Sequence, residues 1–133
     1  MIKLLLVADA YLVGLGVVVA LVVYPAFSLV GEGEWSRYHR RHSSAITWAV
    51  GPVWALQGLI SGWWIIAGPH RTLGVVHGVF ALLGVLVTIS GAIPAHDGLS
   101  KSYDPTIMKR LTRWHLVRTS LWITALIIAI ASF

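Results

Sequence analysis

Long apolar segments alternate with short polar ones along the chain. The apolar stretches are residues 4–24, 46–67, 72–93 and 116–133. The first three are long enough for the roughly 20 residues that a helix needs to cross a bilayer, and the last reaches that length when residues 111–115 are included. A transmembrane β-barrel needs alternating segments of about 10 residues, and a soluble bundle needs a polar stripe on each helix. The pattern therefore predicts an all-α integral membrane four-helix bundle in one domain.

The second and fourth helices are expected to extend beyond their apolar parts. An amphipathic helical pattern from Glu34 to Ile46 precedes the second stretch. Asp104 and Pro105, ahead of the fourth, are typical of an N-cap followed by proline at the first helical position. Prolines near residues 25 and 94 are expected to end the first and third helices. The predicted helices are residues 4–24, 34–67, 72–93 and 105–133, and the first exceeds a signal-peptide core in length, so we expect it to be retained.

Charge and composition set the orientation. The chain is 57% hydrophobic and 11% charged, against roughly 25% charged residues in a soluble domain. Four crossings place both termini on one side with the turn at residues 68–71, and the two longer connections on the other. The latter side holds eight of the ten basic residues: Arg37, Arg40, Arg41, Lys101, Lys109, Arg110, Arg113 and Arg118. The positive-inside rule then predicts an inner (plasma) membrane protein with cytoplasmic basic loops and both termini outside.

The same features limit the partners. The net charge of +5 is explained by topology and contact with lipid headgroups, and no nucleic-acid motif accompanies it. The absence of cysteine excludes disulfides, thiolate metal sites, iron–sulfur clusters and covalent c-type haem. Gly74 and Gly78 form a small-xxx-small pair that favours packing inside the bundle, or alternatively a homo-oligomer seam.

Four of the six histidines fall at helix ends on the predicted cytoplasmic side: His39, His42, His96 and His115. Imidazole is the commonest protein ligand for transition metals and also exchanges protons near neutral pH. Because three helix ends can converge there, we expect a site for zinc, iron, copper or haem, or a set of acid–base groups facing a lipophilic molecule. The alternative is that these interfacial histidines only bond headgroups or cap helices.

Arg118 is the second candidate, about one turn into the apolar part of the fourth helix. An unpaired charge there costs at least roughly 2.5 kcal/mol. Its side chain either snorkels to the interface, or faces the bundle and meets a carboxylate or an anionic or quinoid oxygen. Tyr38 and Trp114 are the other candidate substrate-binding residues. Tyr38, like Tyr24, offers a hydroxyl group. Trp114 or Trp122, each four residues from Arg118, can make a cation–π contact with it.

Asp9 and His77 form a separate candidate pair. Each lies about two turns into its helix from the side of the termini, so the two side chains can meet at equal depth. A buried pair offsets the cost of burying each group. We interpret it as a structural clasp, with half of a proton path as the alternative.

Several short motifs also resemble a known group of proteins. They are Tyr24-Pro25, Tyr38-His39-x-x-His42, Pro52, Pro94-x-His96 and Arg118-Thr119 with Trp122. They resemble small uncharacterised bacterial four-helix membrane proteins and, more distantly, the anthrone-oxygenase-like family. In those proteins asparagine commonly stands at the position of His115 and tryptophan at that of Leu116. The resemblance therefore implies a functional role for His39, His42 and His96 more strongly than for His115. The resemblance implies oxygen or redox chemistry on a lipophilic molecule.

Two hypotheses on function follow. The first is a membrane protein whose histidine-lined cytoplasmic site binds a metal or a lipophilic redox-active molecule. Oxidoreductase activity is one function consistent with such a site. The second is a non-catalytic small subunit of a larger membrane complex, in contact with pigment or haem. A transporter is disfavoured because the middle of the sequence-predicted bundle looks apolar.

Overall fold

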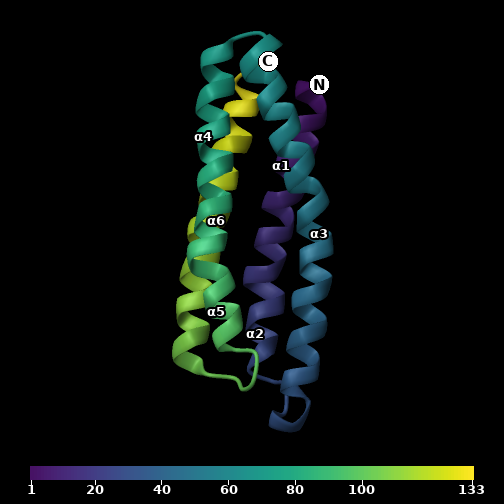
Figure 1. Ribbon diagram of the computed structural model, residues 1–133, viewed down its shortest axis with the longest axis vertical. Helices are drawn as coiled ribbons and strands as arrows, with labels where there is room; N and C mark the ends of the chain where they lie inside the picture. The colour runs from purple at the N-terminus through teal and green to yellow at the C-terminus, as the bar shows by residue number, and fades with distance from the viewer.

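The computed structural model describes residues 1–133 as four helical rods in one bundle (Figure 1). The rods are α1 (Ile2–Val18) with the π-helical η1 (Val19–Val23) and α2 (Tyr24–Phe27); α3 (Glu32–Ala67); α4 (Arg71–Val87) with the π-helical η2 (Thr88–Ala92) and α5 (Ile93–Gly98); and α6 (Pro105–Ile130). Both termini and the turn between α3 and α4 lie at one end of the bundle (Figure 1). The predicted all-α four-helix bundle is confirmed.

Each rod packs against two neighbours. α1 contacts α3 and α6, and α4 contacts the same two helices from the opposite side. The rods Ile2–Phe27, Glu32–Ala67 and Arg71–Gly98 are long and apolar enough to cross a membrane. The order of a long helix, a π-helical turn, a short helix and then a second long helix occurs twice along the chain. The bundle is therefore built from two similar helical hairpins.

The first and third helices do not end at their prolines as the sequence predicted. Each π-helical turn ends two residues before a proline, at Val23 before Pro25 and at Ala92 before Pro94. In these turns an amide bonds the carbonyl five residues back, as Tyr24 does with Val19. Proline has no amide hydrogen to donate, and the wider π-helical turn accommodates it. The helical backbone therefore continues to Phe27 and Gly98. His96 therefore lies inside α5 rather than after the end of a helix.

The extended second and fourth helices begin at residues whose side chains stabilise a helix N-terminus. α3 carries Glu32 and Glu34 in its first turn, where acidic groups stabilise the positive end of the helix dipole. Asp104 caps α6, since its Oδ1 accepts hydrogen bonds from the amides of Thr106 and Ile107 at 2.7 and 3.0 Å. The predicted cap is confirmed, and α6 ends at Ile130 instead of running to Phe133.

Small residues let large side chains pack between the rods. The close pairs are Gly16 with Thr119, Gly74 with Trp64, Gly84 with Trp122, and Gly91 with Trp114. These contacts join α1 to α6, α4 to α3, and the third rod to α6. Packing inside the bundle therefore accounts for Gly74, one of the two glycines of the small-xxx-small pair.

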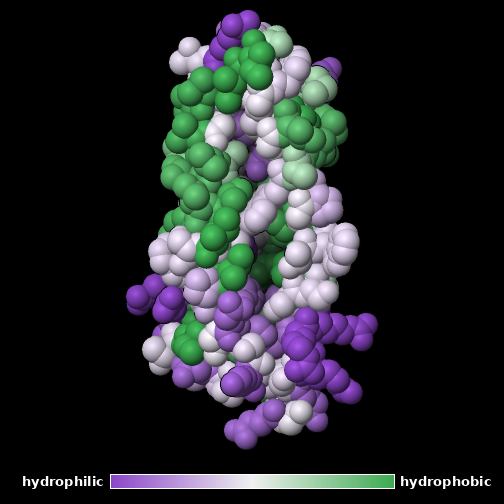
Figure 2. All heavy atoms as spheres, in the orientation of Figure 1, coloured by the Kyte–Doolittle hydropathy of each residue, from purple (hydrophilic) through white to green (hydrophobic).

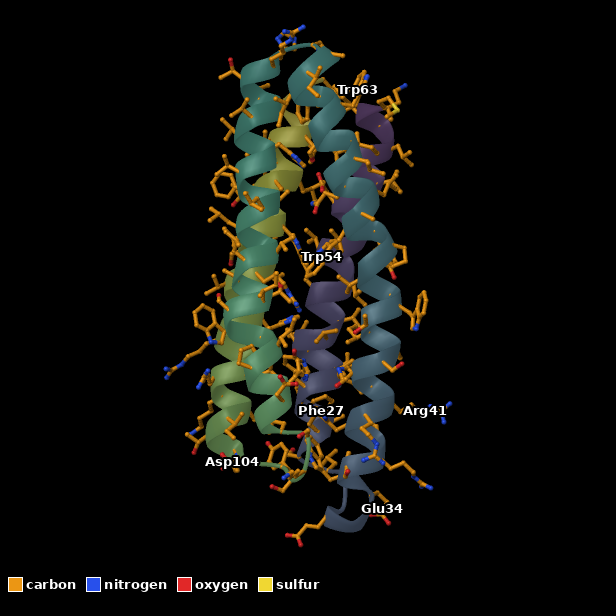
Figure 3. All side chains as sticks on the ribbon, viewed as in Figure 1. Phe27, Glu34, Arg41, Trp54, Trp63 and Asp104 are labelled. Carbon is orange, nitrogen blue, oxygen red and sulfur yellow. The ribbon has the colours of Figure 1, made fainter.

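Hydrophilic side chains gather at the end opposite the termini (Figure 2). Glu34, Arg41 and Asp104 lie at this end, and Trp63 lies at the other (Figure 3). Between the two ends, much of the surface is apolar, as a bilayer requires.

Candidate functional site

A cavity of about 600 Å³ lies between α3 on one side and η2 and α5 on the other. Figure 2 shows the bundle hollowed on this face, between the column of α4 and α5 and that of α3. Val19, Tyr24 and Arg118 close its floor, and most of its surface is apolar. The volume falls in the range of roughly 300–1,000 Å³ that is typical of small-molecule sites. The remaining lining residues are His39, Arg40, Ser43, Ile46, Thr47, Val50, Gly51, Trp54, Thr88, Ala92, Ile93, His96, Asp97 and Ser100.

Three polar side chains form a chain of close contacts along this cavity. The Tyr24 hydroxyl lies 3.4 Å from His96 Nε2, and His96 Nδ1 lies 3.2 Å from His39 Nε2. α2, α5 and α3 supply one member each. Because a hydroxyl and an imidazole can both donate and accept, such a chain can pass a proton from Tyr24 to His39.

An aromatic cluster holds the histidine end in place. The Trp35 ring stacks on His39 with the centroids 5.4 Å apart, and Trp35 Nε1 donates to the Leu99 carbonyl at 2.6 Å. Phe27 meets the His42 ring edge-on at 5.0 Å. The tryptophan thus ties the start of α3 to the end of α5, and these contacts fix the orientation of the imidazoles.

Arg118 is buried in the cavity floor, with 9% of its surface exposed. Its guanidinium donates to Thr88 Oγ1 at 3.3 Å and to His115 Nδ1 at 2.9 Å, and Cζ lies 4.8 Å from the centre of the Trp122 ring. It therefore does not snorkel to the interface. No carboxylate pairs with it, and its Nε has no hydrogen-bond partner. A buried cation in this state retains unused capacity to bind an oxygen acceptor.

His115 positions Arg118 and does not line the cavity. Because arginine only donates, His115 Nδ1 must accept and therefore carries no hydrogen. The hydrogen then lies on Nε2, which donates to the Gly16 carbonyl at 2.8 Å. Both ring nitrogens are thus engaged, and the imidazole links α1 to the guanidinium.

The arrangement of donor atoms does not favour the four-histidine ligand set. No three His, Cys, Asp or Glu side chains are placed to hold a metal ion. His39 and His96 bond each other, both nitrogens of His115 are used, and His42 Nε2 is buried without a partner. The histidines do form a buried network, but the interpretation as a site for a metal or haem iron gains no support from its geometry.

Two other predicted substrate contacts lie outside the cavity lining. Tyr38 is 38% exposed and packs edge-on against Phe27, at a centroid distance of 5.8 Å. Trp114 packs against Gly91, and the guanidinium of Arg118 stacks on Trp122 instead. Of the two tyrosines expected to offer a hydroxyl group, Tyr24 is the one that lines the cavity.

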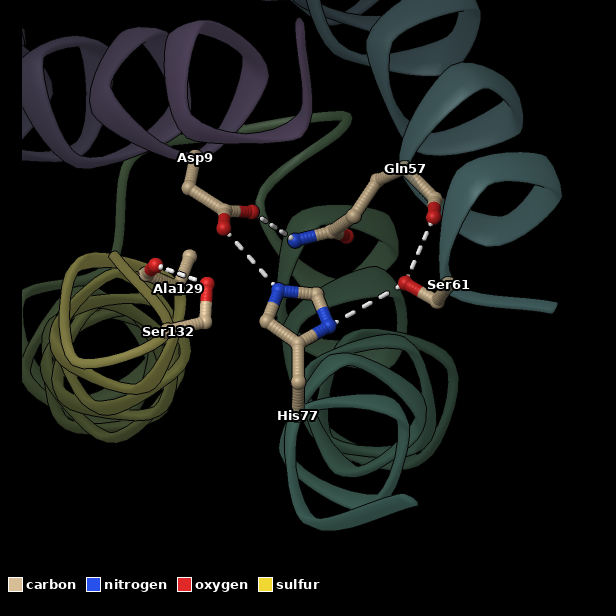
Figure 4. A network of polar contacts seen from close by, with 6 residues as sticks. All are labelled: Asp9, Gln57, Ser61, His77, Ala129 and Ser132. Carbon is tan, nitrogen blue, oxygen red and sulfur yellow. Dashed lines mark hydrogen bonds and ion pairs between the residues drawn. The ribbon is translucent and has the colours of Figure 1, made fainter. Parts of the chain in front are cut away.

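A second, buried polar network lies nearer the termini, with members from α1, α3 and α4 (Figure 4). Asp9 Oδ2 lies 2.9 Å from His77 Nε2, and Asp9 Oδ1 accepts from Gln57 Nε2 at 2.7 Å. The Ser61 hydroxyl donates to the Gln57 carbonyl at 2.6 Å and lies 3.1 Å from His77 Nδ1. Since its one hydrogen is used, Nδ1 must be the donor toward Ser61. Asp9 and His77 then share a single proton, in a pair without net charge.

The two networks are separated by an apolar layer. Leu12, Val50 and Trp122 pack together as one cluster. On α1, Leu12 lies between Asp9 and Gly16, so this apolar cluster lies between the two networks along that helix. The separation favours a clasp over half of a proton path for Asp9 and His77.

Sequence reasoning missed four polar or aromatic residues of these sites: Thr88, Trp54, Gln57 and Ser61. The interior is consequently more polar than the sequence suggested. Gln57 and Ser61 lie four residues apart inside an apolar run, and a polar residue in a membrane helix usually faces a partner. That spacing was a usable signal. Nothing in the sequence connects Thr88 to Arg118, because only the packing of η2 on α6 brings them together.

Comparison with protein-family models, with curated proteins and with solved structures finds no match to this chain. The resemblance to anthrone-oxygenase-like proteins therefore stays a prediction.

Proposed function

We propose that this protein binds a lipophilic, redox-active molecule of the quinone or phenol type in the cavity, with Arg118 as the ligand of one ring oxygen. The observation that carries the proposal is a buried guanidinium without a carboxylate, with an unpaired Nε, on the floor of a mostly apolar cavity. A carbonyl or phenolate oxygen satisfies such a donor, and apolar walls suit the ring.

Two further features support this ligand. The Trp54 side chain lines the cavity, and its buried Nε1 lacks a partner, which gives a second donor for an oxygen acceptor. Tyr24, His96 and His39 supply a route for the proton of a ligand hydroxyl. The proton passes to the Tyr24 oxygen, the Tyr24 proton passes to His96 Nε2, and the His96 Nδ1 proton passes to His39 Nε2. This is the acid–base chemistry that a quinol or phenol needs.

The orientation belongs to the same proposal. α6 lies along α1 and α4, so we infer that it is the fourth span although its sequence is less apolar than the others. The polar end of the bundle then faces the cytoplasm and both termini face outward, which places the cavity in the inner half of the membrane.

Binding of 2,3-dimethyl-1,4-naphthoquinone to the bilayer-reconstituted protein tests the proposal, with quenching of tryptophan fluorescence as the readout. A hydrogen bond to a charged group contributes about 1.5–3 kcal/mol. We therefore expect Arg118→Gln to weaken binding by roughly 10- to 100-fold. The matched control Arg113→Gln removes an exposed charge from the same helix and should change the Kd less than twofold.

Stability measurements make the test specific. Because Arg118 is a buried charge without a counter-ion, its replacement by glutamine should leave thermal stability in detergent unchanged or raised. Equal binding by the wild type and Arg118→Gln, or no binding by the wild type, would refute the proposed function.

A further inference from the structure

The cavity is a long groove that opens on the side of the bundle. Its α3 wall runs from His39 to Trp54, about 20 Å along the helix axis. The facing wall runs from Thr88 to Ser100. Lining residues on both rims are exposed, among them Thr47 on α3 and Ile93 on α5. The groove therefore communicates with the surroundings of the bundle, at the level where α3 becomes apolar.

Contacts join the two walls at the polar end of the groove and again beyond its other end. At the polar end, Trp35 bonds the Leu99 carbonyl, and His39 bonds His96. At the other end, Trp64 of α3 packs on Gly74 of α4. No hydrogen bond joins residues 43–54 to residues 88–93. The result is a window on the side of the bundle: its apolar part faces the hydrocarbon of the bilayer, and the exposed Arg40 and Asp97 line its polar end.

We propose that the natural ligand carries an alkyl or isoprenoid tail, reaches the cavity sideways from the bilayer through this window, and leaves its tail between α3 and α5. The inference rests on the proposed function, since the ring must sit at Arg118. The ring oxygen meets a donor at the floor, while the tail follows Ile46, Val50 and Ile93 out to the lipid. Because the tail leaves lipid hydrocarbon and not water, its gain in the groove comes from close van der Waals packing against these side chains.

Two quinones with the same ring separate the contribution of the tail to the affinity from that of the ring. 2,3-Dimethyl-1,4-naphthoquinone has no tail, and menaquinone-4 has four isoprene units in place of one methyl group. Their Kd values are measured in bilayer discs and expressed as mole fractions in the membrane, which removes the effect of partitioning. We expect menaquinone-4 to bind at least 10-fold more tightly. Equal Kd values would overturn the inference, while tailless binding that depends on Arg118 would leave the proposed function intact.

A reversible plug tests the route. The chain has no cysteine, so Thr47→Cys can be modified alone with a bulky aromatic methanethiosulfonate and restored by reduction. Modification should remove the tail-dependent gain, and reduction of the same sample should return it, which excludes misfolding as the cause. Leu59→Cys, on α3 but outside the groove and 74% exposed, is the matched control. A gain that survives modification at Thr47 would overturn the proposed window, and absence of any quinone binding would overturn the proposed function with it.

Discussion

Replacing Asp9 by leucine removes the acceptor at the centre of the buried network near the termini. Two donors lose their partner, Gln57 Nε2 at 2.7 Å and His77 Nε2 at 2.9 Å. Asp9 and His77 are fully buried and Gln57 is 2% exposed, so water cannot replace the lost bonds. The substitution therefore tests whether the pair acts as a clasp.

The expected cost follows from these two bonds. An unsatisfied buried donor costs about 1–3 kcal/mol, and breaking a buried ion pair from one side costs about 3–5 kcal/mol. We expect Asp9→Leu and His77→Leu each to lower the free energy of unfolding by about 3–5 kcal/mol. The double variant leaves neither partner behind, so its cost should fall at least 2 kcal/mol below the sum of the single costs.

Reversible unfolding in mixed detergent micelles, followed by tryptophan fluorescence, measures these differences. The control Ala10→Leu adds the same side chain at an exposed position of α1 and should change the free energy of unfolding by less than about 0.5 kcal/mol. Additive costs of the two single variants would refute the reasoning, because independent sites add within about 0.5 kcal/mol.

Two further predictions concern packing and orientation. A Cβ at Gly91 overlaps the Trp114 ring, so Gly91→Ala should lower the free energy of unfolding by about 1–3 kcal/mol, whereas Gly62→Ala meets nothing within 4 Å and should be neutral or stabilising in the same assay. In intact cells, a membrane-impermeant thiol reagent should label Ser132→Cys, beside the C-terminus, but not Ser102→Cys, in the basic connection before α6; the reverse pattern would contradict the proposed orientation.

The sequence by itself determined the class of fold, the end of the second helix at Ala67 and the start of the fourth at Pro105. Continuous apolar runs admit only helices in a membrane, since every backbone polar group must be bonded within the segment. Asp104 marked the start of α6 because a cap is a local interaction between neighbouring residues. Helical spacing likewise placed His39 and His42 toward the interior face of α3.

The tertiary structure decided what the polar residues do. His96 meets Tyr24 because two π-helical turns carry both helices past their prolines, which no local rule anticipated. His115 Nε2 donates to the Gly16 carbonyl of α1, and Arg118 donates to Thr88 of η2. These pairings depend on which faces of distant helices pack together, and helical periodicity fixes a face but not its partner.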